Sequence, residues 1–269
     1  MRALRFHAPG MILALGLILF ILLPVLTVFL WAFAEQWFYP SLLPTKWGFR
    51  FWHAVMARPD VWRALLTSLQ TTSIVTALSA VICLPAAYAF ARMPFPGRQG
   101  LMMSFMMASA FPRFAITISL AVLFLTFGLV GTITGVVIVQ LLGTMLLMIW
   151  LPTAAFRGVS PAMEEAARDV GAGPIRVFWS ITLPQAAPSL GAALLLTFVW
   201  TFYEVEGAWL VGVPRVQTMP LLMMQMINNQ LVVQYGAVLS VALWVPSLVA
   251  LFFARRVLGS DTFAKGLGA

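Results

Sequence analysis

The charged segment 157–187 holds the residues whose types and spacing are best suited to binding another molecule. Ser160 can cap a helix that begins at Pro161, because serine is a favoured N-cap and proline a favoured first helical residue. Two carboxylates, Glu164 and Glu165, fall in the first turns, where the helix dipole favours negative charge. The pattern predicts a short helix with an acidic start.

A glycine turn and a second helix are expected to follow. Gly171 and Gly173 are natural helix terminators, and Pro174 can open the next helix. Ala166 and Ala167 give the first helix a surface that another protein can approach closely. The residues alone leave two interpretations open: a protruding docking surface, or an ordinary connector between two longer helices.

Two acids, Glu204 and Glu206, end a long uncharged run over 177–203. A carboxylate at membrane depth costs ~2.5 kcal/mol or more and usually faces a water-filled path. Positions two apart lie about 200° apart on a helix, so both cannot face the same path unless the helix is locally unwound. One hypothesis is that Glu204 or Glu206 lines a path for a cationic or hydrogen-bonding solute, while Arg113 or Arg215 pairs with the other acid. The alternative is that both acids merely end a span at the external interface.

Catalytic and metal-binding patterns are missing from the sequence. It contains no GxxxxGK[ST], HExxH or GxSxG motif and no Cys/His set with metal-ligand spacing. The two histidines, His7 and His53, lie near the ends of apolar runs, and the lone Cys83 reads as a small hydrophobe. We therefore expect no catalytic residue, no metal and no cofactor bound by this chain.

The composition indicates that membrane-spanning helices position segment 157–187 and the two acids. Of 269 residues, 62% are hydrophobic and 9% are charged, far from the roughly 25% charged of an average soluble domain. Residues 11–34 and 64–91 contain no Asp, Glu, Lys, Arg or His, and each run exceeds the ~20 residues that cross a bilayer as a helix. The net charge of +8 comes from basic residues at the ends of apolar runs, which suits loops beside anionic lipid and not nucleic acid.

The apolar runs predict an all-α, polytopic membrane protein with six transmembrane helices in one domain, 1–269. We read the N-terminal run as a retained first span, because it is longer than the apolar region of a cleavable signal peptide. The third and fourth spans are parted only by glycines, which predicts a tight hairpin. The six predicted spans are 11–34, 64–91, 99–126, 133–156, 188–211 and 232–254.

Orientation follows from the distribution of Lys and Arg in the loops, because cytoplasmic loops are enriched in both. Ten basic residues fall on one side and five on the other, which favours both termini and segment 157–187 in the cytoplasm. The ten are Arg2, Arg5, Arg92, Arg98, Arg157, Arg168, Arg176, Arg255, Arg256 and Lys265; the five are Lys46, Arg50, Arg58, Arg63 and Arg215. Segment 35–63 is then the first external loop, and its many Trp, Tyr and Phe residues suit the headgroup level.

Segment 157–187 resembles the EAA loop of the permease subunits of bacterial binding-protein-dependent importers. That pattern is EAA, three residues, G, nine residues, I, one residue, LP. Every fixed position matches, with both spacings, at Glu165, Ala166, Ala167, Gly171, Ile181, Leu183 and Pro184. Seven specified residues on the expected cytoplasmic side make a specific signal.

The resemblance implies the type I permease fold, with a cytoplasmic coupling helix and a location in the bacterial inner membrane. It implies that Glu165 supplies a polar contact to a separate ATP-binding subunit dimer, Ala166 and Ala167 close packing, and Gly171 the turn. ATP would be bound by that partner, and the chain would not be an enzyme. A second permease, identical or homologous, and an extracytoplasmic solute-binding protein are the other implied partners.

The candidate cargoes are ranked only by less specific sequence similarities to members of this family. The end of the second span, 84–92, and the segment 218–221 look closest to permeases for polyamines, ferric iron or phosphonate-like solutes. A permease of the same family for another solute such as a sugar is the alternative. A stand-alone secondary transporter is a further alternative, although we find no internal repeat of the kind such proteins show.

Overall fold

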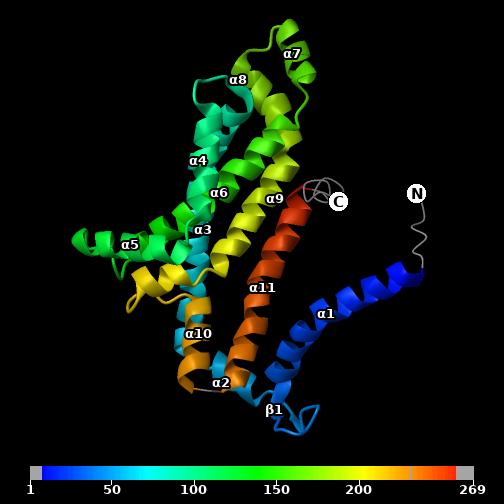
Figure 1. Ribbon diagram of the computed structural model, residues 1–269, viewed down its shortest axis with the longest axis vertical. Helices are drawn as coiled ribbons and strands as arrows, with labels where there is room; N and C mark the ends of the chain where they lie inside the picture. Colours follow the sequence, from blue (N-terminus) through cyan, green and yellow to red (C-terminus); the bar gives the residue numbers. More distant parts are fainter. Residues whose placement is uncertain (1–7, 231, 259–269) are drawn as a thin grey trace. The chain divides into compact units, whose positions relative to one another are not determined.

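The computed structural model describes residues 8–230 and 232–258, and it is built almost entirely of helices (Figure 1). The elements in chain order are α1 (Ala8–Phe33), β1 (Ala34–Gln36), β2 (Lys46–Trp47), α2 (Arg50–Met56), α3 (Pro59–Arg92), α4 (Arg98–Ala110), α5 (Arg113–Thr126), α6 (Ile133–Arg157), α7 (Pro161–Asp169), α8 (Pro174–Val177), the π-helix η1 (Phe178–Thr182), α9 (Leu183–Phe202), the π-helix η2 (Ala208–Gly212), α10 (Met219–Gln230) and α11 (Val233–Leu258).

Among the described residues, five helical stretches are long and apolar enough to cross a membrane. They are α1, α3, α6, the continuous stretch Pro174–Phe202 and α11. Helices α4 and α5 pass the same test as a pair, which gives up to six spans if the pair counts as one. The prediction of a polytopic, all-helical membrane fold is confirmed.

The chain divides into two compact units, which are described separately. The first comprises the described parts of 1–62 and 222–245. In it, α1 is followed by the antiparallel pair β1–β2, which aligns Ala34 with Trp47. Lys46 donates to Glu35 across this hairpin at 2.9 Å and holds the pKa of the Glu35 carboxyl below its usual range. Apolar side chains of α1 are largely exposed, for example Phe20 at 80%, so α1 needs lipid or another chain to cover it.

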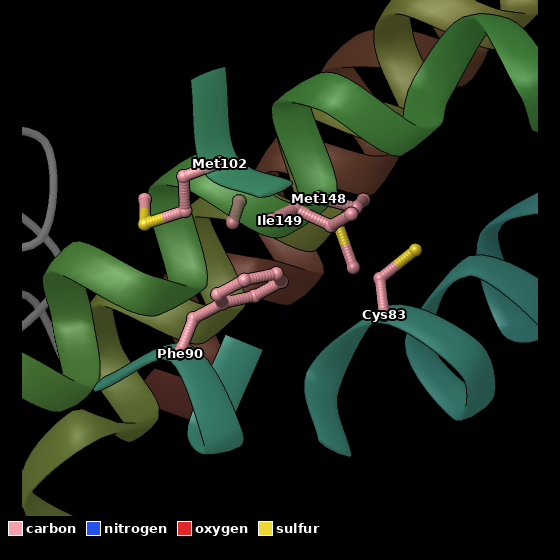
Figure 2. Packing of buried hydrophobic residues seen from close by; sticks show 6 residues of the cluster. Cys83, Phe90, Met102, Met148 and Ile149 are labelled. Carbon is pink, nitrogen blue, oxygen red and sulfur yellow. The ribbon is translucent and has the colours of Figure 1, made fainter. Parts of the chain in front are cut away.

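The second unit comprises 63–221 and the described part of 246–269, and its core forms where α3, α4, α6 and α9 meet. Figure 2 shows the central cluster of this core, to which each of these four helices contributes at least one side chain. Helix α6 packs along α9, and the helices that flank segment 157–187 are therefore held together. The cluster consists of Cys83, Phe90, Met102, Met148, Ile149 and Ala193. Cys83 is buried there as the sequence predicted.

The third predicted span, 99–126, is not one continuous helix. Helices α4 and α5 meet at an angle of 93°, with Phe111 and Pro112 between them. Phe111 is extended, with φ −72° and ψ 145°, because the ring of the following proline disfavours the helical conformation. Pro112 is the residue of this run that can kink a helix, and the bend lies directly at it.

The fifth predicted span, 188–211, is also wrong at its end. Helix α9 stops at Phe202, and residues 203–205 are irregular before a helical turn at Glu206 and Gly207 leads into η2. Glu204 therefore lies in a break between two helices, and Glu206 begins the helical turn that follows it. The stretch before the last span forms α10, although its end carries the polar residues Gln225, Asn228 and Asn229. Met219, Leu222 and Met226 recur at helical spacing and are all buried, which favours the helix.

Candidate functional site

Segment 157–187 begins as the sequence predicted, with a short helix and a glycine turn, but its second helix is not separate from the fifth span. Helix α7 begins at Pro161, and Gly171 turns the chain with φ +87°, a conformation that glycine adopts without the strain that a Cβ would cause. Helix α8 begins at Pro174 and continues through η1 into α9. The predicted cap is wrong in one detail, because the side chain of Ser160 makes no capping hydrogen bond.

Glu164 fastens α7 to the rest of the second unit. Its Oε1 accepts a hydrogen bond from Nη2 of Arg92 at 3.1 Å and another from Oγ1 of Thr182 at 2.7 Å. The same Arg92 nitrogen donates to the carbonyl of Val159 at 2.7 Å. Both side chains of the ion pair are largely buried, at 16% and 6% exposure. The end of α3, α7 and η1 therefore meet at this carboxylate, and Arg92 also ties the start of the loop to them.

The sequence analysis missed this role of Glu164. It treated Glu164 and Glu165 alike, as charges that complement the helix dipole. Neighbouring residues on a helix point about 100° apart, so only one of the two can face inward. The structure turns Glu164 inward and leaves Glu165 exposed.

Aromatic and aliphatic packing anchors the base of the loop. Phe178 of η1 lies edge-on to Tyr88 of α3, with ring centroids 5.1 Å apart. Leu183 packs against a buried cluster that includes Phe156 and Leu190. Of the residues in the EAA pattern, Ile181 and Leu183 are half-buried at this base, and Pro184 is exposed.

The tip of the loop is exposed and partly apolar. Glu165, Ala166 and Gly171 are exposed and Ala167 is half-buried. Large apolar side chains surround them, and a water-exposed group of this kind marks a protein contact surface. These side chains and their exposed fractions are Met163 (52%), Val170 (86%), Ile175 (76%) and Trp179 (64%). The tip therefore presents exposed apolar side chains beside small residues, above a base that packs against the neighbouring helices.

Glu204 and Glu206 differ in their surroundings. Glu204 is buried, and its two oxygens accept hydrogen bonds from Nε2 of Gln140 at 3.1 Å and from the amide of Gly207 at 2.6 Å. Oε2 of Glu206 is buried without a hydrogen-bond partner. Neither acid forms an ion pair within 4 Å in the part of the chain that the structure describes, so Arg113 and Arg215 are not their partners there.

A cavity of about 550 Å³ opens beside the bend between α4 and α5. The guanidinium of Arg113, the first residue of α5, lies 4.2 Å from the ring centroid of Trp200 on α9. Gly143 of α6 makes room, because a Cβ there would lie 2.8 Å from the guanidinium and 2.9 Å from the ring. Hydroxyl side chains complete the polar lining, namely Ser109, Thr117, Thr144 and Thr197. Neither Glu204 nor Glu206 lines this cavity.

The sequence analysis did not identify this cavity. Its residues come from four helices, and none of them forms a local motif. The signals that pointed to it were a lone arginine within an apolar run and the proline directly before it.

We predict that Glu164→Ala destabilises the protein by about 3–5 kcal/mol, because Arg92 would remain buried without its counter-charge. Glu165→Ala, at the exposed neighbouring position, should change stability by no more than about 0.5 kcal/mol. Thermal unfolding of the detergent-solubilised chain measures both. Equal unfolding temperatures for the two variants would show that Glu164 does not fasten the loop.

Comparisons with known proteins agree on one family. Residues 82–258 match the family model described as the binding-protein-dependent transport system inner membrane component. The chain is 31% identical to a maltose/maltodextrin transport system permease of Salmonella typhimurium, over 73% of this chain and 74% of that one. It is 28% identical to a trehalose transport system permease of Mycobacterium tuberculosis, over 61% of this chain and 60% of that one.

A solved structure shares the fold. A chain of a bacterial ABC transporter involved in the import of the acidic polysaccharide alginate aligns with a TM-score of 0.70 and 17% identity, covering 95% of this chain and 98% of that one. The matched family model covers more than half of the sequence and includes the whole of segment 157–187. The chain therefore belongs to the family of binding-protein-dependent transport system inner membrane components, as a multi-pass inner-membrane permease subunit of an ABC importer.

Proposed function

We propose that the tip of segment 157–187 seats in a separate ATP-binding subunit and transmits its movement to the membrane helices. The observation that carries this proposal is the exposed tip at Glu165, Ala166 and Gly171, held on a base that Glu164 fixes. Glu165 makes the polar contact, Ala166 and Ala167 allow close packing, and Gly171 turns the chain. The second half of the loop is anchored to the membrane helices through the half-buried Ile181 and Leu183, which Pro184 follows.

Three connections, two covalent and one ionic, can transmit movement of the tip to the membrane helices. Segment 157–187 continues directly from α6 and into α9, which pack against each other. The third route is the ion pair from Glu164 to Arg92, the last residue of α3. Displacement of α7 therefore pulls on α3, α6 and α9 together.

The complete transporter in this proposal has four kinds of component besides lipid. A dimer of ATP-binding subunits binds the ATP, a second permease, identical or homologous, completes the path, and an extracytoplasmic solute-binding protein delivers the cargo. Both termini and the loop face the cytoplasm, as the distribution of basic residues favours. Arg2, Arg5 and Lys265, which contribute to that distribution, lie outside the described residues.

The proposed cargo is a carbohydrate, which replaces the earlier ranking of polyamine, ferric iron or phosphonate. The two relatives described above are named as trehalose and maltose permeases, and neither name supports a polyamine. The cavity also argues against a cation, because Arg113 lines it and would repel positive charge. Hydroxyl groups and the aromatic Trp200 suit the polar edges and apolar faces of a sugar.

We predict that Glu165→Arg abolishes cargo-stimulated ATP hydrolysis in the reconstituted transporter, because a bulky cation would replace the anion at the docking contact. The matched control is Gln99→Arg, an exposed position on the same side of the membrane helices but outside the loop. That control should retain near-normal stimulation. Stimulation of the Glu165→Arg transporter at the level of the control would refute the docking role.

We predict that Trp200→Ala and Ser109→Ala, the latter at an exposed hydroxyl of the cavity, raise the KM for saccharide uptake by roughly tenfold, the scale of one lost aromatic or hydrogen-bond contact. The exposed Trp62→Ala does not touch the cavity and serves as the uptake control for cargo affinity. Uptake into vesicles with the cognate binding protein present measures the KM. An unchanged KM in both cavity variants would exclude this cavity from the path.

A further inference from the structure

A second cavity lies at the ends of α4 and α6 that adjoin segment 157–187. Its volume is about 650 Å³. It shares no residue with the cavity at Arg113 and plays no part in the proposed function. Its lining has two different halves, a cationic rim and an apolar wall.

Two arginines form the rim. Arg98 is the first residue of α4 and Arg157 is the last residue of α6. Arg157 donates from Nη2 to the carbonyl of Phe90 at 3.4 Å and to the sulfur of Met102 at 3.6 Å, which leaves its other donors available. Across residues 8–230 and 232–258, no carboxylate lies within 4 Å of either guanidinium. The rim therefore carries two positive charges without a protein counter-charge.

The wall consists of side chains one and two turns further into the membrane helices. Met102 is buried and belongs to the cluster in Figure 2, so it fixes the floor of the cavity to the core. Met103 and Met106 are 57% and 51% exposed, and Trp150 of α6 is 36% exposed. Methionine adapts to flexible apolar ligands, and tryptophan favours the boundary between headgroups and acyl chains.

We propose that this cavity, hereafter the rim cavity, binds the headgroup and upper acyl chain of an anionic phospholipid. Phosphate oxygens accept charge-assisted hydrogen bonds from Arg98 and Arg157 at the level where helix ends meet the membrane surface. The acyl chain lies along Met103, Met106 and Trp150. A lipid with one net negative charge neutralises part of the rim, whereas a zwitterionic headgroup brings its own cation to the same place.

The apolar wall distinguishes a lipid from a free phosphate ion. An inorganic anion would use the two arginines and leave Met103, Met106 and Trp150 exposed to water. A phospholipid uses both halves of the cavity. The site also lies beside the base of the coupling segment, because Arg157 is the residue at which that segment begins.

The test measures lipid binding to the full chain in detergent by native mass spectrometry. Phosphatidylglycerol is compared with phosphatidylcholine of the same acyl chains, in the wild type and in Arg98→Gln/Arg157→Gln. The loss of both charges should weaken phosphatidylglycerol binding by roughly 30-fold, because each basic residue near the membrane surface contributes about fivefold. Phosphatidylcholine binding should change little.

The matched control is Arg63→Gln/Arg215→Gln, which removes the same charge from two exposed positions outside the rim cavity. It should keep the preference for phosphatidylglycerol. Arg98→Lys/Arg157→Lys should also keep most of that preference, because the charge remains. An equal preference in wild type and Arg98→Gln/Arg157→Gln would overturn the proposal.

Two further measurements keep the test decisive if Arg98→Gln/Arg157→Gln fails to fold. Arg98→Gln alone should retain about a fifth of the wild-type affinity for phosphatidylglycerol, and an unchanged affinity would overturn the proposal. Met103→Gln/Met106→Gln changes two exposed side chains and should weaken the binding of both lipids. If it weakens neither, and millimolar inorganic phosphate displaces phosphatidylglycerol from the wild type, the rim cavity is a free-anion site and not a lipid site.

Discussion

The hydrogen bonds to Oε1 of Glu164 fix the position of α7 relative to the membrane helices, and the proposed function depends on that position. A largely buried carboxylate is costly unless it is paired, and here Arg92 and Thr182 supply both the charge and the second donor. Such a pair contributes less to net stability than to geometry, because replacing both partners with apolar residues is often neutral. Its consequence is that α7 has one position relative to α3 and η1. In the coupling role that we propose, a loop held less firmly would absorb the movement of the ATP-binding subunit instead of passing it on.

The bilayer imposes the second constraint. Backbone polar groups need partners within hydrocarbon, so a helix can break there only where protein or a water-filled cavity surrounds the break. The bend at Phe111 and Pro112 and the irregular stretch after Phe202 are two such breaks. The first borders the cavity that holds Arg113, and the amide of Gly207 in the second is satisfied by Glu204. Charged and polar groups therefore gather where the helices are interrupted.

Local signals explain what the sequence could predict. Pro161, Gly171 and Pro174 act within a few residues of themselves, so the two helices and the turn of segment 157–187 were predictable. Glu164 could not be distinguished from Glu165, because its partner Arg92 is 72 residues away in the chain. The same holds for Gln140, which bonds Glu204 from 64 residues away. The polar residues at the end of α10 are typical of a loop, but the apolar spacing of Met219, Leu222 and Met226 favours the helix that forms.

Cross-linking tests the central claim, contact between the loop tip and a motor subunit, most directly. Cys83 is the single cysteine and is buried, so a Cys83→Ala background allows a cysteine to be placed at one chosen position. With the assembled transporter, Ala166→Cys should cross-link to the ATP-binding subunit through a short thiol-to-amine reagent. Ser104→Cys, exposed on α4, should not. Cross-linking at Ser104→Cys but not at Ala166→Cys, or at neither position in an assembled transporter, would contradict the account.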